Sequence, residues 1–193
     1  LRSTNREKYC GGANYANAKQ LGNYKAEFYE IDSSTRHFIL WADERKRCVD
    51  VILHSPENIA SLSLLEYNPS CSVDGKDTRD MLFFTLRFLK KKGIREVSLM
   101  DNSRIECNGT KIHLAPMYFL KYGQTWYEKY FGFKPTEKYK DKYEEMKRRR
   151  ETMLSVSHLS QMPCDFFTED VVDNLFEHIG FVFLEKIEWT KKL

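Results

Sequence analysis

The feature that most constrains the fold is a change of periodicity at Thr78. Before that residue, four short segments between positions 25 and 67 are rich in β-branched and aromatic residues and are separated by the turn-like SST, DER and SPEN. From Thr78 the apolar residues of TRDMLFFTLRFLKKKG recur at a spacing of about 3.6, and the strand-like IREVSLMD follows the glycine that ends this helix. Four successive strands predict an antiparallel meander, and the strand, helix, strand order predicts a parallel crossover pair.

The remainder of the chain predicts mainly helices. We expect helical segments in PMYFLKYGQTWYEKYFG, KYKDKYEEMKRRRETML and DFFTEDVVDNLFEHIG, and a closing strand in FVFLEKIEW. The fold class is therefore α/β (α+β), with a mixed, largely antiparallel sheet flanked by helices. We divide the chain into an irregular N-terminal arm (1–24), a core (25–135) and a C-terminal helical extension with the closing strand (136–193), packed on the core.

The charge balance argues against a dedicated partner of one charge sign. The 193 residues include 31 Lys and Arg against 28 Asp and Glu, a formal net charge of +3, so a nucleic-acid partner is not expected. The basic run 147–150 has Glu144, Glu145 and Glu151 close to it on the same predicted helix, which favours a solvated face. No apolar stretch approaches the roughly 18 residues of a membrane span, and the amino terminus lacks the apolar centre of a secretory signal.

Five cysteines, an odd number, are widely spaced and include no CxxC pair. This pattern argues against a disulfide framework and against a zinc site, and no other metal-ligand spacing is present. We expect reduced thiols in an intracellular protein, cytoplasmic or part of a virion. The tripeptide Asn108-Gly109-Thr110 fits the acceptor pattern for N-glycosylation in a secreted protein, but such tripeptides are common by chance.

Two motifs carry a resemblance to a known family. LLEYNPSCSVDGKDTRD joins the fourth predicted strand to the first helix, and WYEKYFGF ends the next predicted helical stretch. In this order they resemble the GNAT superfamily of acetyl-CoA-dependent N-acetyltransferases, over about residues 60 to 135. The resemblance implies a pyrophosphate-binding loop at the amino end of the helix, where backbone N–H groups meet the phosphates. The coenzyme contacts that it implies are those of Leu65, Tyr67, Ser72, Gly75, Lys76, Asp77 and Thr78.

The resemblance also implies catalytic residues. Tyr127 of WYEKYFGF takes the position of the family's tyrosine, which protonates the leaving thiolate of the coenzyme. For the base that deprotonates the amine, the carboxylates at strand ends are Glu66 and Asp101, and the sequence does not choose between them. The same tyrosine could equally be a core residue, since aromatic neighbours surround it.

Two functions remain open. The first is a GNAT-like N-acetyltransferase that uses acetyl-CoA and an amine acceptor which the sequence does not specify. The second is a catalytically inactive GNAT-like domain with a structural or protein-interaction role. It is favoured by Asp74, Asp77 and Asp80, which bring carboxylates to the place where phosphates should bind. The C-terminal extension could present an apolar face to a protein partner or to a second copy of the chain.

Overall fold

The computed structural model describes residues 19–21, 24–30, 35–43, 46–65, 78–153, 156–179, 184 and 187–193. The chain forms two compact units, residues 1–97 together with Leu193, and residues 98–192. The boundary between the units falls inside strand β6 (Glu96–Met100). The sequence analysis placed the main division later, between the core (25–135) and the C-terminal extension (136–193).

The first unit is built on an antiparallel meander. Its strands are β1 (Lys19–Leu21), β2 (Tyr24–Glu30), β3 (Thr35–Asp43), β4 (Lys46–His54) and β5 (Ile59–Leu65). They are hydrogen-bonded in chain order, and each of these pairs is antiparallel. The predicted meander is confirmed, with one addition, because β1 lies in the stretch that we expected to be an irregular arm.

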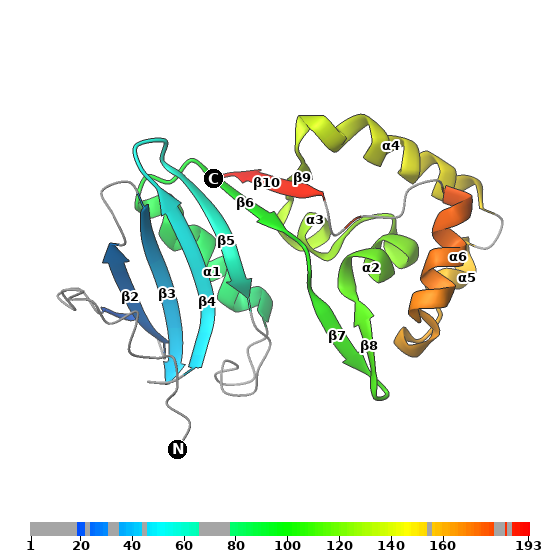
Figure 1. Ribbon diagram of the computed structural model, residues 1–193, viewed down its shortest axis with the longest axis horizontal. Helices are drawn as coiled ribbons and strands as arrows, with labels where there is room; N and C mark the ends of the chain where they lie inside the picture. The colour runs from blue at the N-terminus through cyan, green and yellow to red at the C-terminus, as the bar shows by residue number, and fades with distance from the viewer. Residues whose placement is uncertain are drawn as a thin grey trace, which may run out of the picture. The chain divides into compact units, whose positions relative to one another are not determined.

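Helix α1 (Thr78–Lys91) connects the neighbouring strands β5 and β6, as the change of periodicity predicted. Its buried face consists of Met81, Leu82, Thr85, Leu86 and Leu89, the spacing of one stripe of a helix. The helix lies against the sheet (Figure 1). Beside this face, the ring of Phe88 stacks on that of Phe38 from β3 at a centroid distance of 4.9 Å. Gly93, at φ 85°, follows the last turn in the left-handed conformation that glycine adopts most readily.

In the second unit, the described residues form a hairpin, five α-helices and a small pair of strands. Its elements after β6 are β7 (Arg104–Cys107), β8 (Thr110–His113), α2 (Leu114–Tyr122), α3 (Trp126–Phe131), β9 (Lys134–Pro135), α4 (Glu137–Thr152), α5 (Val156–Leu159), the short 3-10 helix η3 (Cys164–Phe166), α6 (Glu169–Ile179) and β10 (Glu188–Lys192). β10 pairs antiparallel with β9, with Trp189 opposite Pro135. Together with the meander, this gives the expected α+β class, a largely antiparallel sheet flanked by helices.

Aromatic side chains form the core of the second unit. Tyr143 of α4 packs edge-on against Trp189 of β10, with 5.1 Å between the ring centroids, and its ring is tilted against that of Phe119 of α2 at 5.6 Å. Phe119 in turn stacks on Phe176 of α6 at 5.9 Å. The apolar stripe of α6 therefore packs within its own unit at Phe176, and Ile179 of the same stripe is also buried.

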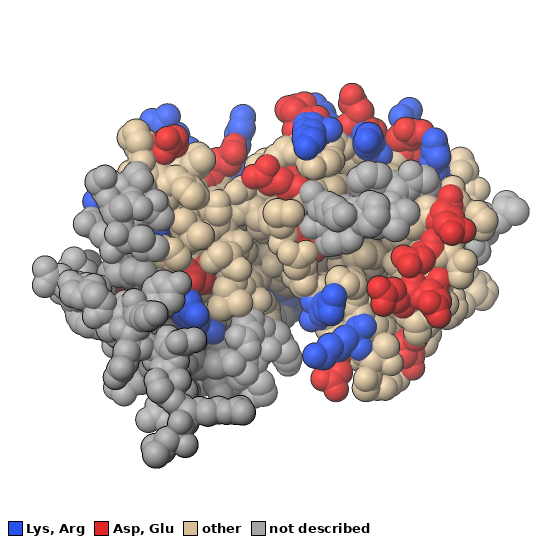
Figure 2. All heavy atoms as spheres, in the orientation of Figure 1, with Lys and Arg blue, Asp and Glu red and all other residues tan. Residues whose placement is uncertain are grey.

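Helix α4 has a mixed charged surface and one buried cation. Figure 2 shows basic and acidic side chains interspersed along it, and Arg149 pairs with Glu145 one turn away. Arg150 departs from the expected solvated face, because it is 6% exposed and its guanidinium donates to the carbonyl oxygens of Leu120 (2.7 and 2.9 Å) and Lys121 (2.9 Å). Arg150, which the sequence predicted to be solvated, thus supplies the side-chain cap for the carboxyl end of α2.

No helix in the described part of the chain is long and apolar enough to cross a membrane.

Candidate functional site

Tyr127 lies in the first turn of α3, where it is 5% exposed. The helix starts there because Thr125 is its N-cap, with the threonine hydroxyl oxygen accepting from the N–H of Glu128 at 3.3 Å. The Tyr127 ring contacts Trp126 at 4.9 Å and Phe133 at 5.8 Å, both edge-on. The phenol is thus held within an aromatic environment, as the packing interpretation of WYEKYFGF expects.

Asp101 follows directly after β6 and is 2% exposed. Its Oδ1 accepts a hydrogen bond from the N–H of Ser103 at 3.1 Å, and its Oδ2 has no hydrogen-bond partner among the described residues. Burial raises the pKa of the Asp101 carboxyl from 3.8 to about 6, and hydrogen bonds from the hydroxyl and N–H of Ser103 oppose that rise. The group is therefore a carboxylate near neutral pH that keeps one oxygen available to accept a proton.

Ser103 connects the two predicted catalytic residues. Burial raises the pKa of Tyr127, the nearby charge of Asp101 raises it further, and a hydrogen bond with the Ser103 side chain lowers it. We call Asp101, Ser103 and Tyr127 the acid–base cluster. The sequence predicted Asp101 and Tyr127 individually but did not predict Ser103. The sequence feature that could have indicated Ser103 is its position two residues after a strand-end aspartate, which is the spacing of an Asx turn.

This cluster can support proton transfer. A buried carboxylate with a pKa near 6 is ionised at neutral pH yet basic enough to take a proton, which is the property required of a general base. The raised pKa of Tyr127 keeps its phenol protonated, so it can donate a hydrogen bond or act as an acid but cannot act as a base. Asp101 can therefore act as a base and Tyr127 as an acid, and both lie in the second unit.

The predicted coenzyme loop is only partly visible. Glu66, Tyr67, Ser72, Gly75, Lys76 and Asp77 lie outside the described residues. Leu65 is the last residue of β5 and is half-buried, and Thr78 is the first residue of α1, as predicted. The first turn of α1 presents N–H groups suited to an anion, but it also carries the carboxylate of Asp80.

A second set of charged groups, which the sequence did not predict, surrounds Glu128. This side chain is 1% exposed and accepts hydrogen bonds from the Tyr143 hydroxyl (2.5 Å), Lys147 Nζ (2.9 Å) and Lys134 Nζ (3.1 Å). Burial and the charge of Glu128 raise the pKa of Tyr143. Because all its polar atoms are engaged, the Glu128 cluster is best explained as a link that joins α3, β9 and α4.

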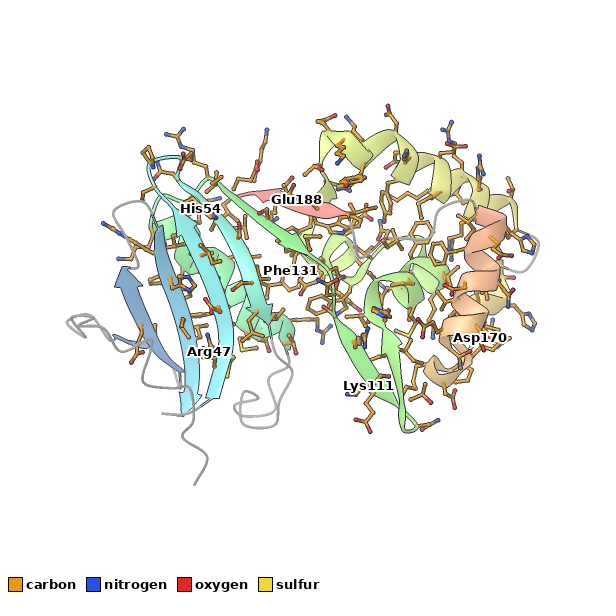
Figure 3. The ribbon with its side chains drawn as sticks, viewed as in Figure 1. Arg47, His54, Lys111, Phe131, Asp170 and Glu188 are labelled. Atoms are coloured by element: carbon orange, nitrogen blue, oxygen red, sulfur yellow. A yellow bond between two sulfur atoms is a disulfide. The ribbon has the colours of Figure 1, made fainter. Side chains whose placement is uncertain are left out.

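A third charged group lies in the first unit. Asp50 of β4 is 6% exposed, its Oδ1 lies 2.9 Å from His37 Nδ1 on β3, and its Oδ2 lies 3.1 Å from Arg47 Nη1. Figure 3 shows Arg47 near the start of β4 and His54 near its end. The arrangement satisfies a buried carboxylate on the sheet and needs no ligand to explain it.

The expectation of reduced thiols is wrong for three cysteines. Cys107 at the end of β7 and Cys164 in η3 form a disulfide with a Cα–Cα distance of 6.0 Å, and Cys48 is also disulfide-bonded. The odd number and wide spacing of the cysteines did not predict this bridge, because pairing depends on distances in the fold and not on sequence separation.

No protein-family model, curated protein or solved structure matches this chain. Among the described residues, no group of three or more His, Cys, Asp or Glu side chains could hold a metal ion.

Proposed function

We propose that the chain is a GNAT-like N-acetyltransferase that transfers an acetyl group from acetyl-CoA to an amine. The single observation that carries the proposal is the acid–base cluster, in which a buried Asp101 with a pKa of about 6 lies close enough to Tyr127 to raise the pKa of the phenol. A buried carboxylate with an unpartnered oxygen costs stability, so its presence is better explained by use than by packing.

In this proposal Asp101 is the base and Tyr127 the acid. The free Oδ2 of Asp101 would accept a proton from the attacking ammonium group, so the amine becomes nucleophilic. The Tyr127 hydroxyl would donate its proton toward the sulfur that leaves, and the N–H of Ser103 holds the Asp101 carboxylate in position. Asp101 replaces Glu66 as the preferred base, because its burial and pKa are those that the role requires.

Acetyl-CoA would supply the acetyl thioester. Among the described residues, the part of the chain that fits its pyrophosphate is the amino end of α1 at Thr78, through backbone N–H groups and the positive end of the helix dipole. The Asp80 carboxylate in the same turn opposes anion binding, which predicts weak binding that falls as salt increases.

The test is calorimetric titration of the full chain with acetyl-CoA and with CoA at low salt, followed by an acetylation assay on a panel of amines. We expect saturable binding, and turnover that is lost in Asp101→Asn and reduced in Tyr127→Phe. The matched control is Tyr130→Phe, which alters a phenol on the same helix that is 40% exposed instead of buried. Asp77→Gly tests whether repulsion in the loop limits affinity.

The pH profile separates catalysis from packing. If Asp101 is the base, the limb of kcat/KM on the acid side should rise with a midpoint near pH 6 and should be absent in Asp101→Asn. The proposal would be refuted if neither the unmodified chain nor Asp77→Gly bound the coenzyme. It would also be refuted if Tyr127→Phe and Asp101→Asn were both as active as the unmodified chain.

One observation favours the alternative of an inactive GNAT-like domain with a structural or interaction role. Tyr127 is 5% exposed and its ring packs edge-on against Trp126 and Phe133, as expected of a core tyrosine. Under this alternative the C-terminal extension would take a protein partner or a second copy. Binding of coenzyme that appears only in Asp77→Gly would support it.

A further inference from the structure

The tripeptide Asn108-Gly109-Thr110 lies at the turn of the β7–β8 hairpin (Figure 1). Asn108 at φ 49° and Gly109 at φ 81° are both left-handed, as a two-residue hairpin turn of the Asn-Gly type requires. Asn108, Gly109 and Thr110 are all exposed, and a Cβ built on Gly109 would meet nothing within 4 Å. The acceptor pattern is therefore at a surface turn, which is where modification of an asparagine needs it.

The second observation is the state of the neighbouring cysteine. Cys107, the residue before the turn, is disulfide-bonded to Cys164, and Cys48 in the first unit is also disulfide-bonded. Two bridges in one chain indicate an oxidising compartment, because cytosolic thiols are kept reduced. N-glycosylation occurs in chains that pass through such a compartment, so the tripeptide and the disulfides point to the same place.

We propose that Asn108 is an acceptor for N-linked glycosylation. In the reaction, Asn108 Nδ2 forms a bond to the anomeric carbon of an oligosaccharide carried on a polyisoprenyl diphosphate. The bond from that carbon to the diphosphate oxygen breaks, and the diphosphate leaves with the electron pair. One proton leaves Nδ2 to a base, and nothing is oxidised or reduced.

The folded hairpin has room for the product. Asn108 Nδ2 donates to Asp165 Oδ2 at 2.6 Å, and a glycosylated amide retains one N–H, which is sufficient for this bond. The glycan would then extend from the turn beside the disulfide, with the exposed Lys111 of β8 nearby (Figure 3). Glycosylation is therefore compatible with both contacts that join the hairpin to η3, the Asn108–Asp165 hydrogen bond and the Cys107–Cys164 disulfide.

The test is glycopeptide mass spectrometry of the full protein isolated from its source, with thiols alkylated before any reduction. We expect the peptide that contains Asn108 to carry a glycan that is removed by an amidase specific for N-glycans, and Cys107 and Cys164 to resist alkylation. Expression of the chain behind a secretion signal provides the variants. A mobility shift sensitive to the same amidase should be lost in Asn108→Gln and in Thr110→Ala and kept in Thr110→Ser.

Thr110→Ser is the matched control, since it changes the same exposed residue and preserves the hydroxyl that the acceptor pattern needs. An unmodified Asn108 in the natural protein overturns the proposal. So does a shift that survives in Asn108→Gln, or a secreted, disulfide-bonded chain that is never glycosylated.

Discussion

Asp101→Asn should change how the stability of the protein depends on pH. The carboxyl is 2% exposed, and its burial raises its pKa from 3.8 to about 6. Between these pH values the folded protein holds a proton that the unfolded chain has released. The folded pKa is the higher one, so the free energy of unfolding falls as the pH rises through this window.

The magnitude follows from the two pKa values. Each pKa unit corresponds to about 1.4 kcal/mol, so the difference between 3.8 and about 6 corresponds to about 3 kcal/mol. This destabilisation is absent below pH 3.8, grows up to about pH 6 and is complete above it. Asparagine is neutral throughout and can still accept the 3.1 Å hydrogen bond from Ser103. The stability of the variant minus that of the unmodified protein should therefore increase by about 3 kcal/mol across the window.

The assay is urea denaturation of both proteins at a series of pH values from below 4 to 7.5. Any constant cost of the new amide, such as an unpaired buried N–H, cancels when the difference at one pH is compared with that at another. Ser103→Ala supplies a check of direction, because losing the hydroxyl that lowers the Asp101 pKa should extend the window upward. A difference between Asp101→Asn and the unmodified protein that stays constant with pH would refute the reasoning.

The other predictions concern the second unit. Glu128→Gln should lower the free energy of unfolding by about 2 to 3 kcal/mol, since a buried acceptor of three hydrogen bonds from a phenol and two lysines loses its charge. Glu144→Gln, which removes an exposed 3.5 Å pair to one of those lysines, should change it by less than about 1 kcal/mol. Equal effects in denaturant titrations would contradict this. Replacing Cys107 and Cys164 together by serine opens a link across 57 positions and should cost ~4 kcal/mol by chain entropy, seen as a lower denaturation midpoint under oxidising conditions. An unchanged midpoint would show that the bridge does not stabilise the fold.

The meander and α1 could be predicted because each depends on a local pattern. Met81, Leu82, Leu86 and Leu89 lie on one stripe in the sequence, and all four are buried in the structure. The β7–β8 hairpin was missed although Asn108-Gly109 is a strong hairpin signal, because the strands on either side have only four residues each. Here the turn chemistry was more informative than the periodicity.

The sites could be predicted only in part, because their partners are distant in the sequence. Nothing near Glu128 predicts its burial, since its partners at positions 134, 143 and 147 approach only when α4 packs on α3. Asp101 was predicted from its position at a strand end, and Tyr127 from its position in the motif WYEKYFGF. Their electrostatic coupling, and the pKa that follows from burial, depend on a fold in which both are almost fully enclosed.

Acetyltransferase activity and glycosylation at Asn108 would both have to occur in the same oxidising compartment. Acetyl-CoA carries several phosphate charges and does not cross a bilayer unaided, so an acetyltransferase glycosylated at Asn108 needs a carrier that delivers the coenzyme. If that compartment lies near pH 6, about half of the Asp101 carboxyls would be protonated, and the proposed base would work below its full rate. A glycosylated Asn108 together with failure of the coenzyme titration would therefore favour the interaction domain. A glycosylated chain that binds the coenzyme would instead predict transfer to amines inside the oxidising compartment, with a rate that rises as the pH increases through 6.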